Sequence, residues 1–171
     1  MIDYPTIENI YNKILEYFKN HNITVITKEF NHNPSQDIVF NMLVQRAEIK
    51  RYYFSITYLK SLKTFVLFNL TMQFKPEDAN ALKSLKETNK AKHEQFFMDF
   101  RKMVYPLNVD FEITMPEFML TKEVTLESCQ NEQYFMDQVH NFLHAVELIR
   151  IAFDEFFYSM YPQGKPKDDG T

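Results

Sequence analysis

Hydrophobic residues recur along the chain with two different periods, and these periods predict its helices and strands. Over residues 5–21 apolar side chains recur at helical spacing, and Pro5 suits the first turn of such a helix. Four segments with strand character follow, at residues 23–30, 37–45, 50–59 and 64–74. Because short linkers join the second, third and fourth of these segments, we expect them to form antiparallel hairpins.

The strand segments alternate between apolar and polar residues. In residues 64–74 the apolar side chains alternate with Asn69 and Thr71, which predicts a sheet with one covered face and one wetter face. By the same period of two, Asp110 and Glu112 share one face of a later strand. We therefore expect these two acids on the wetter face.

After the fourth strand segment the pattern predicts one long helix over roughly 76–104, with Pro76 in its first turn. Its first half is polar and its second half is apolar on one side, so we expect part of it to project from the domain or to be covered by a partner. Two strands and a last helix follow, at residues 108–115, 118–126 and 129–161. Ser128 is the expected N-cap of the last helix.

These elements predict an α+β fold in which an antiparallel sheet packs with three helices, in the order α-β-β-β-β-α-β-β-α. A chain of 171 residues suits one domain, and we place a single α+β domain at residues 1–161. Residues 162–171 contain no apolar residue able to anchor them, so we expect a disordered C-terminal tail.

The net charge and the cysteine content limit the kinds of partner and the compartment that we expect. The net charge of −4 gives no general attraction to nucleic acid or to an anionic membrane, so neither is expected as a partner. No uncharged apolar run approaches the roughly 20 residues of a membrane span. The acidic N-terminus does not resemble a secretory signal, and a single cysteine suits a reducing compartment. We therefore expect a cytoplasmic protein.

Glycine is confined to the end of the chain, at Gly164 and Gly170. Phosphate-cradling loops and the G-x-S-x-G nucleophile elbow both need glycine, so these motifs are excluded from residues 1–163. No cofactor is expected.

The last predicted helix contains two histidines four residues apart, His140 and His144, followed by Glu147. On a helical wheel these residues fall opposite the apolar stripe that faces the sheet. The spacing matches metal-ligand geometry, but Asn141 occupies the position at which a metalloprotease helix carries its catalytic glutamate. A polar helix face is the preferred interpretation, and a metal site is the alternative.

Three apolar residues lie beside these histidines on the outer face of the same helix: Leu148, Ile151 and Tyr158. A fully solvated helix face would rarely carry all three. They predict a second packing surface, covered by a second subunit or by a bound chain.

Cys129 is expected at a helix N-terminus, where the helix dipole lowers the pKa of a thiol. A cysteine nucleophile also needs a histidine base within hydrogen-bond reach. His140 and His144 lie about 16–22 Å further along the same predicted helix, at 1.5 Å per residue. We therefore interpret Cys129 as an incidental free thiol, and we expect no catalytic residue and no enzymatic activity.

The element order and the aromatic-rich strands resemble the type III secretion chaperone-like superfamily, which includes the YbjN-like proteins, and within it an archaeal family of unknown function. The resemblance covers nearly all of residues 5–161. It is carried by the segments "IENIYNKILEYF", "DIVFNMLVQ", "RYYFSITYL", "TFVLFNLTMQF", "VDFEITM" and "VHNFLHAVELIRIAFDEFF". The resemblance implies a small, acidic, usually dimeric α+β domain whose apolar surfaces hold an extended stretch of another protein. The four strands before the long helix depart from the usual three of the secretion chaperones.

Taken together, these patterns predict a non-catalytic protein-interaction module. We expect a homodimer that holds a protein or peptide partner on apolar sheet and helix surfaces, in the manner of a chaperone. Two alternatives stay open: a metal-dependent enzyme or metal sensor that uses His140, His144 and Glu147, and a small-molecule sensor with a pocket between the sheet and the long helix.

Overall fold

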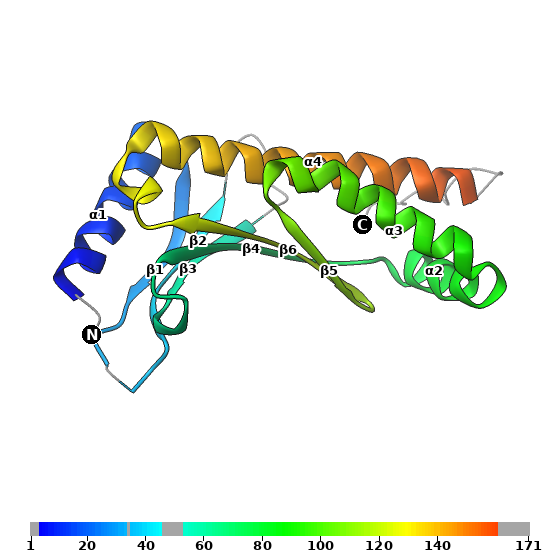
Figure 1. Ribbon diagram of the computed structural model, residues 1–171, viewed down its shortest axis with the longest axis horizontal. Helices are drawn as coiled ribbons and strands as arrows, with labels where there is room; N and C mark the ends of the chain where they lie inside the picture. Colours follow the sequence, from blue (N-terminus) through cyan, green and yellow to red (C-terminus); the bar gives the residue numbers. More distant parts are fainter. Residues whose placement is uncertain (1–3, 34, 46–52, 161–171) are drawn as a thin grey trace, which may run out of the picture.

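The computed structural model describes residues 4–33, 35–45 and 53–160, and within them it has a six-stranded antiparallel sheet and four α-helices (Figure 1). The strands are β1 (Thr24–Phe30), β2 (Ile38–Gln45), β3 (Tyr53–Leu59), β4 (Phe65–Gln73), β5 (Asp110–Thr114) and β6 (Glu117–Thr125). The helices are α1 (Tyr4–Asn20), α2 (Pro76–Thr88), α3 (Lys90–Val104) and α4 (Glu132–Met160), with 3₁₀ turns η1 (Lys60–Leu62), η2 (Tyr105–Leu107) and η3 (Ser128–Gln130). The predicted α+β class is confirmed. The predicted tail at 162–171 and the first residues of the third predicted strand, 50–52, lie outside the described residues.

All neighbouring strands are antiparallel, and their order across the sheet is β1-β2-β3-β4-β6-β5. The chain leaves the sheet after β4, passes through α2 and α3, and returns at the edge strand β5 before β6 inserts beside β4. Register places Ile56, Phe68 and Lys122 in one row across β3, β4 and β6. Because side chains alternate between the faces, this row and its even-numbered neighbours on β4 and β6 point to the same side.

Helix α4 lies along that side of the sheet, with α1 near its N-terminal end and α3 beside its C-terminal half (Figure 1). Its apolar stripe is buried as predicted, from Phe135 through Val139 and Phe142 to Phe157. At one end the ring centroids of Phe68 and Phe135 are 5.7 Å apart. At the other, Phe153 of α4 lies 4.9 Å from Phe118, 5.0 Å from Phe74 and 4.6 Å from Phe100. Through these contacts α4 joins two aromatic clusters into one core.

The prediction of one long helix over 76–104 is wrong, because the chain bends at Asn89. This residue has φ −148° and ψ 76°, outside the helical region, and its backbone N–H donates to the carbonyl of Leu85 at the end of α2. Its side-chain oxygen accepts a hydrogen bond of 3.0 Å from the backbone N–H of Lys92, so Asn89 also caps α3. The two helices pack on one another, and Leu82 of the mainly polar α2 is thereby fully buried.

The expected N-cap at Ser128 is also wrong. Ser128 begins the 3₁₀ turn η3, and the cap of α4 is Asn131, whose side-chain oxygen accepts a hydrogen bond of 3.1 Å from the backbone N–H of Tyr134. Aspartate, asparagine, serine and threonine are all good caps, so composition alone did not decide between the two positions.

Replacing Asn89 with alanine should lower the free energy of unfolding by about 1 kcal/mol, because the backbone N–H of Lys92 loses its acceptor. Urea denaturation followed by circular dichroism measures this loss. Asn80→Ala is the matched control, since Asn80 is an exposed residue within α2 and caps no helix. Equal stability of the two variants would contradict the assigned cap.

Candidate interaction surface

The face of the sheet that points away from α4 is only partly buried. On β4, Leu67 is half-buried, whereas its neighbours Val66 and Phe68 are fully buried beneath the helices. The same alternation holds on β2 and β3, in accord with the predicted wetter face. We call this surface the open face; its strand residues are Thr24, Thr27, Glu29, Ile38, Asn41, Leu43, Gln45, Tyr53, Ser55, Thr57, Leu59, Phe65, Leu67, Asn69, Thr71, Gln73, Asp110, Glu112, Thr114, Glu117, Met119, Thr121, Glu123 and Thr125.

The centre of the open face combines apolar and small polar side chains. Register places Ser55, Asn69 and Thr121 in one row across β3, β4 and β6. Leu43 lies in this row and Leu67 lies in the adjacent row, and both side chains are half-buried. A surface of this kind offers apolar contact area together with hydroxyl and amide groups.

Asn69, at the middle of the open face, has a buried side-chain oxygen that accepts no hydrogen bond from any residue within the described ranges. An unsatisfied buried acceptor costs roughly 1–3 kcal/mol. A threonine or valine at this position would suit a β-strand better. Asn69 is therefore a polar residue of the sheet whose side-chain oxygen is buried at a cost to stability.

A shallow hollow of about 290 Å³ lies on the open face, between residues of β4, β6 and the edge strand β5. Glu112 and Glu117 contribute carboxylates to it, and Thr71 and Thr114 contribute hydroxyls. Met119 forms part of its apolar lining. Asp110 and Glu112 are exposed on this side of the sheet, as the period of two predicted.

The predicted contact residues on α4 lie away from the core. Ile151 is 42% exposed and Tyr158 is 70% exposed, while Leu148 is half-buried. Beside them, a groove of about 280 Å³ between α3 and α4 has a floor of aromatic rings, with Phe96 and Phe156 stacked at a centroid distance of 3.4 Å. The outer side of α4 thus carries apolar groups that the single chain leaves accessible.

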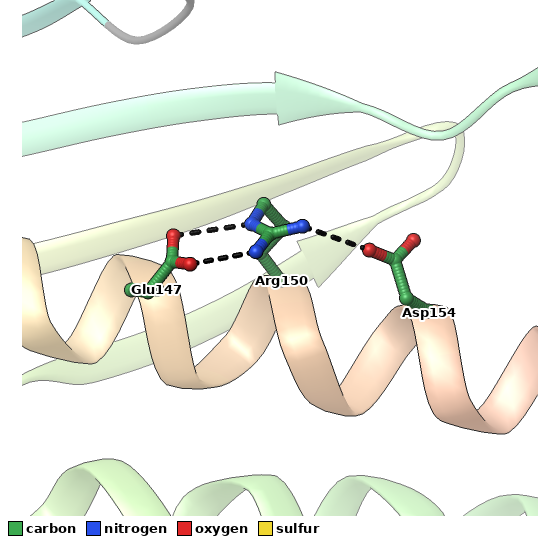
Figure 2. A network of polar contacts seen from close by, with 3 residues as sticks. All are labelled: Glu147, Arg150 and Asp154. Carbon is green, nitrogen blue, oxygen red and sulfur yellow. Dashed lines mark hydrogen bonds and ion pairs between the residues drawn. The ribbon is translucent and has the colours of Figure 1, made fainter. Parts of the chain in front are cut away.

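The three candidate metal ligands, His140, His144 and Glu147, all lie on α4, but the carboxylate of Glu147 is bound by Arg150 (Figure 2). Arg150 donates to both of its carboxylate oxygens, at 2.6 and 3.1 Å, and to Asp154 at 3.0 Å. The hydrogen bonds from Arg150 lower the pKa of Glu147. His140 and His144 are exposed, and the described residues contain no group of three histidines, cysteines or acids placed to hold a metal ion.

The predicted effect of the helix dipole on Cys129 is wrong. Cys129 lies in η3, one turn before α4, and is fully buried in the core. Burial raises the pKa of its thiol to about 12, because the thiolate would have to form away from water. Sequence periodicity could not reveal this burial, which depends on how η3 packs against α1 and β6.

The thiol of Cys129 should therefore fail to react with a water-soluble disulfide reagent at pH 8 while the protein is folded. Full reaction should follow on addition of denaturant, when the pKa returns to its ordinary value. Absorbance of the released thiol measures both steps, and Lys83→Cys supplies an exposed thiol as the positive control. Rapid labelling of Cys129 in the native protein would contradict its burial.

Lys122 is a buried charged residue that the sequence analysis did not single out. It is 2% exposed, its ammonium group donates to the carbonyl of Leu107, and burial lowers its pKa. The sequence pattern could have indicated this burial, because Lys122 is two residues from Leu120 and from Val124 and so shares their buried face of β6. Its contact with η2 ties the end of α3 to the sheet.

Fold and surface together define a class: a small α+β protein with helices packed on one face of a six-stranded antiparallel sheet. The chain belongs to the family described as "Uncharacterized conserved protein (DUF2299)", whose match covers residues 10–153. Within the described part of the chain, each helix is too short or too polar to cross a lipid bilayer.

A solved structure shares the fold: an uncharacterized protein from Methanothermobacter thermautotrophicus, with a TM-score of 0.69. The likeness covers 86% of this chain and 99% of that one at 14% sequence identity, so it concerns the fold alone. No curated protein matches the sequence significantly.

Proposed function

We propose that the protein is a non-catalytic module that holds a segment of a partner polypeptide against the open face of its sheet. The observation that supports this proposal is the accessible apolar area at the centre of that face, where Leu43, Leu67 and Met119 are half-buried in the single chain. Covering the remaining exposed part of one such side chain contributes about 1 kcal/mol. Several together give the modest affinity expected of a holding protein.

The edges of the sheet favour docking on the face over addition of a strand. The edge strand β1 carries a bulge between Val25 and Thr27, and the opposite edge strand β5 has only 5 residues. Bulges and short edge strands both discourage pairing with another chain. A partner segment would therefore find its contacts mainly through side chains on the open face.

The resemblance to the secretion chaperone-like superfamily supports the same proposal, since proteins of that class hold extended stretches of other proteins on apolar surfaces. It also supports a homodimer. We propose the outer side of α4 as the dimer contact, centred on Leu148, Ile151 and Tyr158, which leaves the open face free for the partner.

Binding can be tested with 15-residue peptides selected on the wild-type protein from an unbiased display library. Leu67→Lys should weaken their binding at least tenfold, because a cation replaces apolar contact area at the centre of the open face. The new lysine lies opposite Glu123, so the sheet should tolerate it. Fluorescence anisotropy measures the dissociation constants.

Met98→Lys is the matched control, because Met98 is an exposed apolar residue on α3, away from the open face. This variant should bind the selected peptides as the wild type does. Equal affinity of the Leu67→Lys variant and the control would contradict the proposed function.

The dimer can be tested separately by light scattering during gel filtration. The wild-type protein should have twice the chain mass of 20.6 kDa, and Ile151→Glu should reduce this to a single chain mass by placing a charge in the contact. Met98→Glu should leave the dimer intact. A monomeric wild-type protein, or a dimer unaffected by Ile151→Glu, would count against α4 as the contact.

A further inference from the structure

We infer that the polypeptide held on the open face is basic at its ends and apolar at its centre; this inference rests on the proposed function and specifies its partner. It follows from the distribution of charge across the six described strands. The acids of the open face are Glu29, Asp110, Glu112, Glu117 and Glu123, whereas the two lysines of these strands, Lys28 and Lys122, point to the helix side.

The acids lie at the two margins of the open face. Glu29 lies on the edge strand β1, and the other four lie on β5 and β6 at the opposite margin. Between them, β2, β3 and β4 carry no charged residue. The face thus has an apolar and small-polar centre flanked by negative charge on both sides.

Sheet geometry sets the length of a matching segment. Six strands span five interstrand spacings of about 4.8 Å, or roughly 24 Å, which an extended chain covers in about seven residues. A segment that crosses the strands would therefore place apolar side chains against Leu43 and Leu67. Basic residues at its two ends would lie near Glu29 and near the acids of β5 and β6.

The carboxylates are available to such a partner. Neither Glu112 nor Glu123 makes a hydrogen bond or an ion pair with another residue in the described part of the chain. The hollow beside Glu112 and Glu117, with the hydroxyls of Thr71 and Thr114, gives a lysine or arginine side chain several acceptors at once. Among the acids of the open face, and within the described residues, Glu117 alone has a partner, a hydrogen bond of 2.9 Å from Gln73.

The acids of the open face also argue against a second copy of this chain as the molecule that binds there. A twofold contact through the open face would bring the same acids of two subunits onto one shared surface. Like charges in a contact of this kind cost affinity. The same repulsion disfavours nucleic acid and acidic polypeptides.

Three synthetic nine-residue peptides test the inference. They share one apolar centre of valine, leucine and tyrosine, and they carry two lysines, two glutamines or two glutamates at each end. The lysine peptide should bind about fivefold more tightly than the glutamine peptide at low salt, and the glutamate peptide should bind most weakly. The preference for lysine should shrink as salt is added, because exposed charges are screened.

A double variant, Glu112→Gln with Glu123→Gln, should reduce the preference for the lysine peptide to less than twofold. The matched control is Glu8→Gln with Glu87→Gln, which removes two exposed acids from α1 and α2 and changes the net charge of −4 by the same amount. The control should keep the full preference, and circular dichroism checks that both variants fold.

The outcomes separate this inference from the proposed function. If the three peptides bind equally well and Leu67→Lys abolishes their binding, the inference fails and the proposed function stands. If the control variant loses the preference as fully as the open-face variant, the acids of the open face are not its source and the inference fails. If no peptide binds, or Leu67→Lys has no effect on binding, the proposed function fails together with the inference.

Discussion

The packing of α4 against one face of the sheet is the constraint on which the rest of this structure depends. Its aromatic stripe contacts Phe68 at one end and Phe74 and Phe118 at the other, so a single helix closes both halves of the core. Rings packed at such distances contribute beyond their buried area. Because the helices lie on one side of the sheet, no helix covers the apolar strand residues that point to the other side. The open face is the result of this arrangement.

The open face therefore combines two properties that a monomeric sheet does not need for stability. It retains half-buried apolar side chains such as Leu43 and Leu67, and it retains Asn69 with an unsatisfied buried oxygen. Strand preference alone would favour threonine or valine over asparagine at position 69. The proposed contact with a partner polypeptide would use the half-buried apolar side chains, and the separation of acids from lysines across the sheet would give that contact a preferred charge.

Hydrophobic periodicity predicted the strands, the wetter face and the buried stripe of α4, because these depend on which side of an element faces the core. It failed where a single polar group or tertiary packing decides the outcome. Asn89 divides the long helix through one side-chain hydrogen bond, inside a run whose composition favours helix. The burial of Cys129 and the engagement of Glu147 by Arg150 depend on contacts with other residues, which spacing does not reveal. The strand order, with β6 between β4 and β5, also needed the structure.

We expect the open face to be exposed in the free protein and to become covered when a polypeptide binds. Methyl NMR in the presence of a soluble paramagnetic probe measures this exposure residue by residue. The methyl groups of Leu43, Leu67 and Met119 should broaden in the free protein, while those of the buried Val66 and Leu120 stay sharp. Addition of a bound peptide should restore the first set. Sharp signals from Leu43 and Leu67 in the free protein would contradict the exposure of the open face, and broadening that a bound peptide leaves unchanged would contradict binding there.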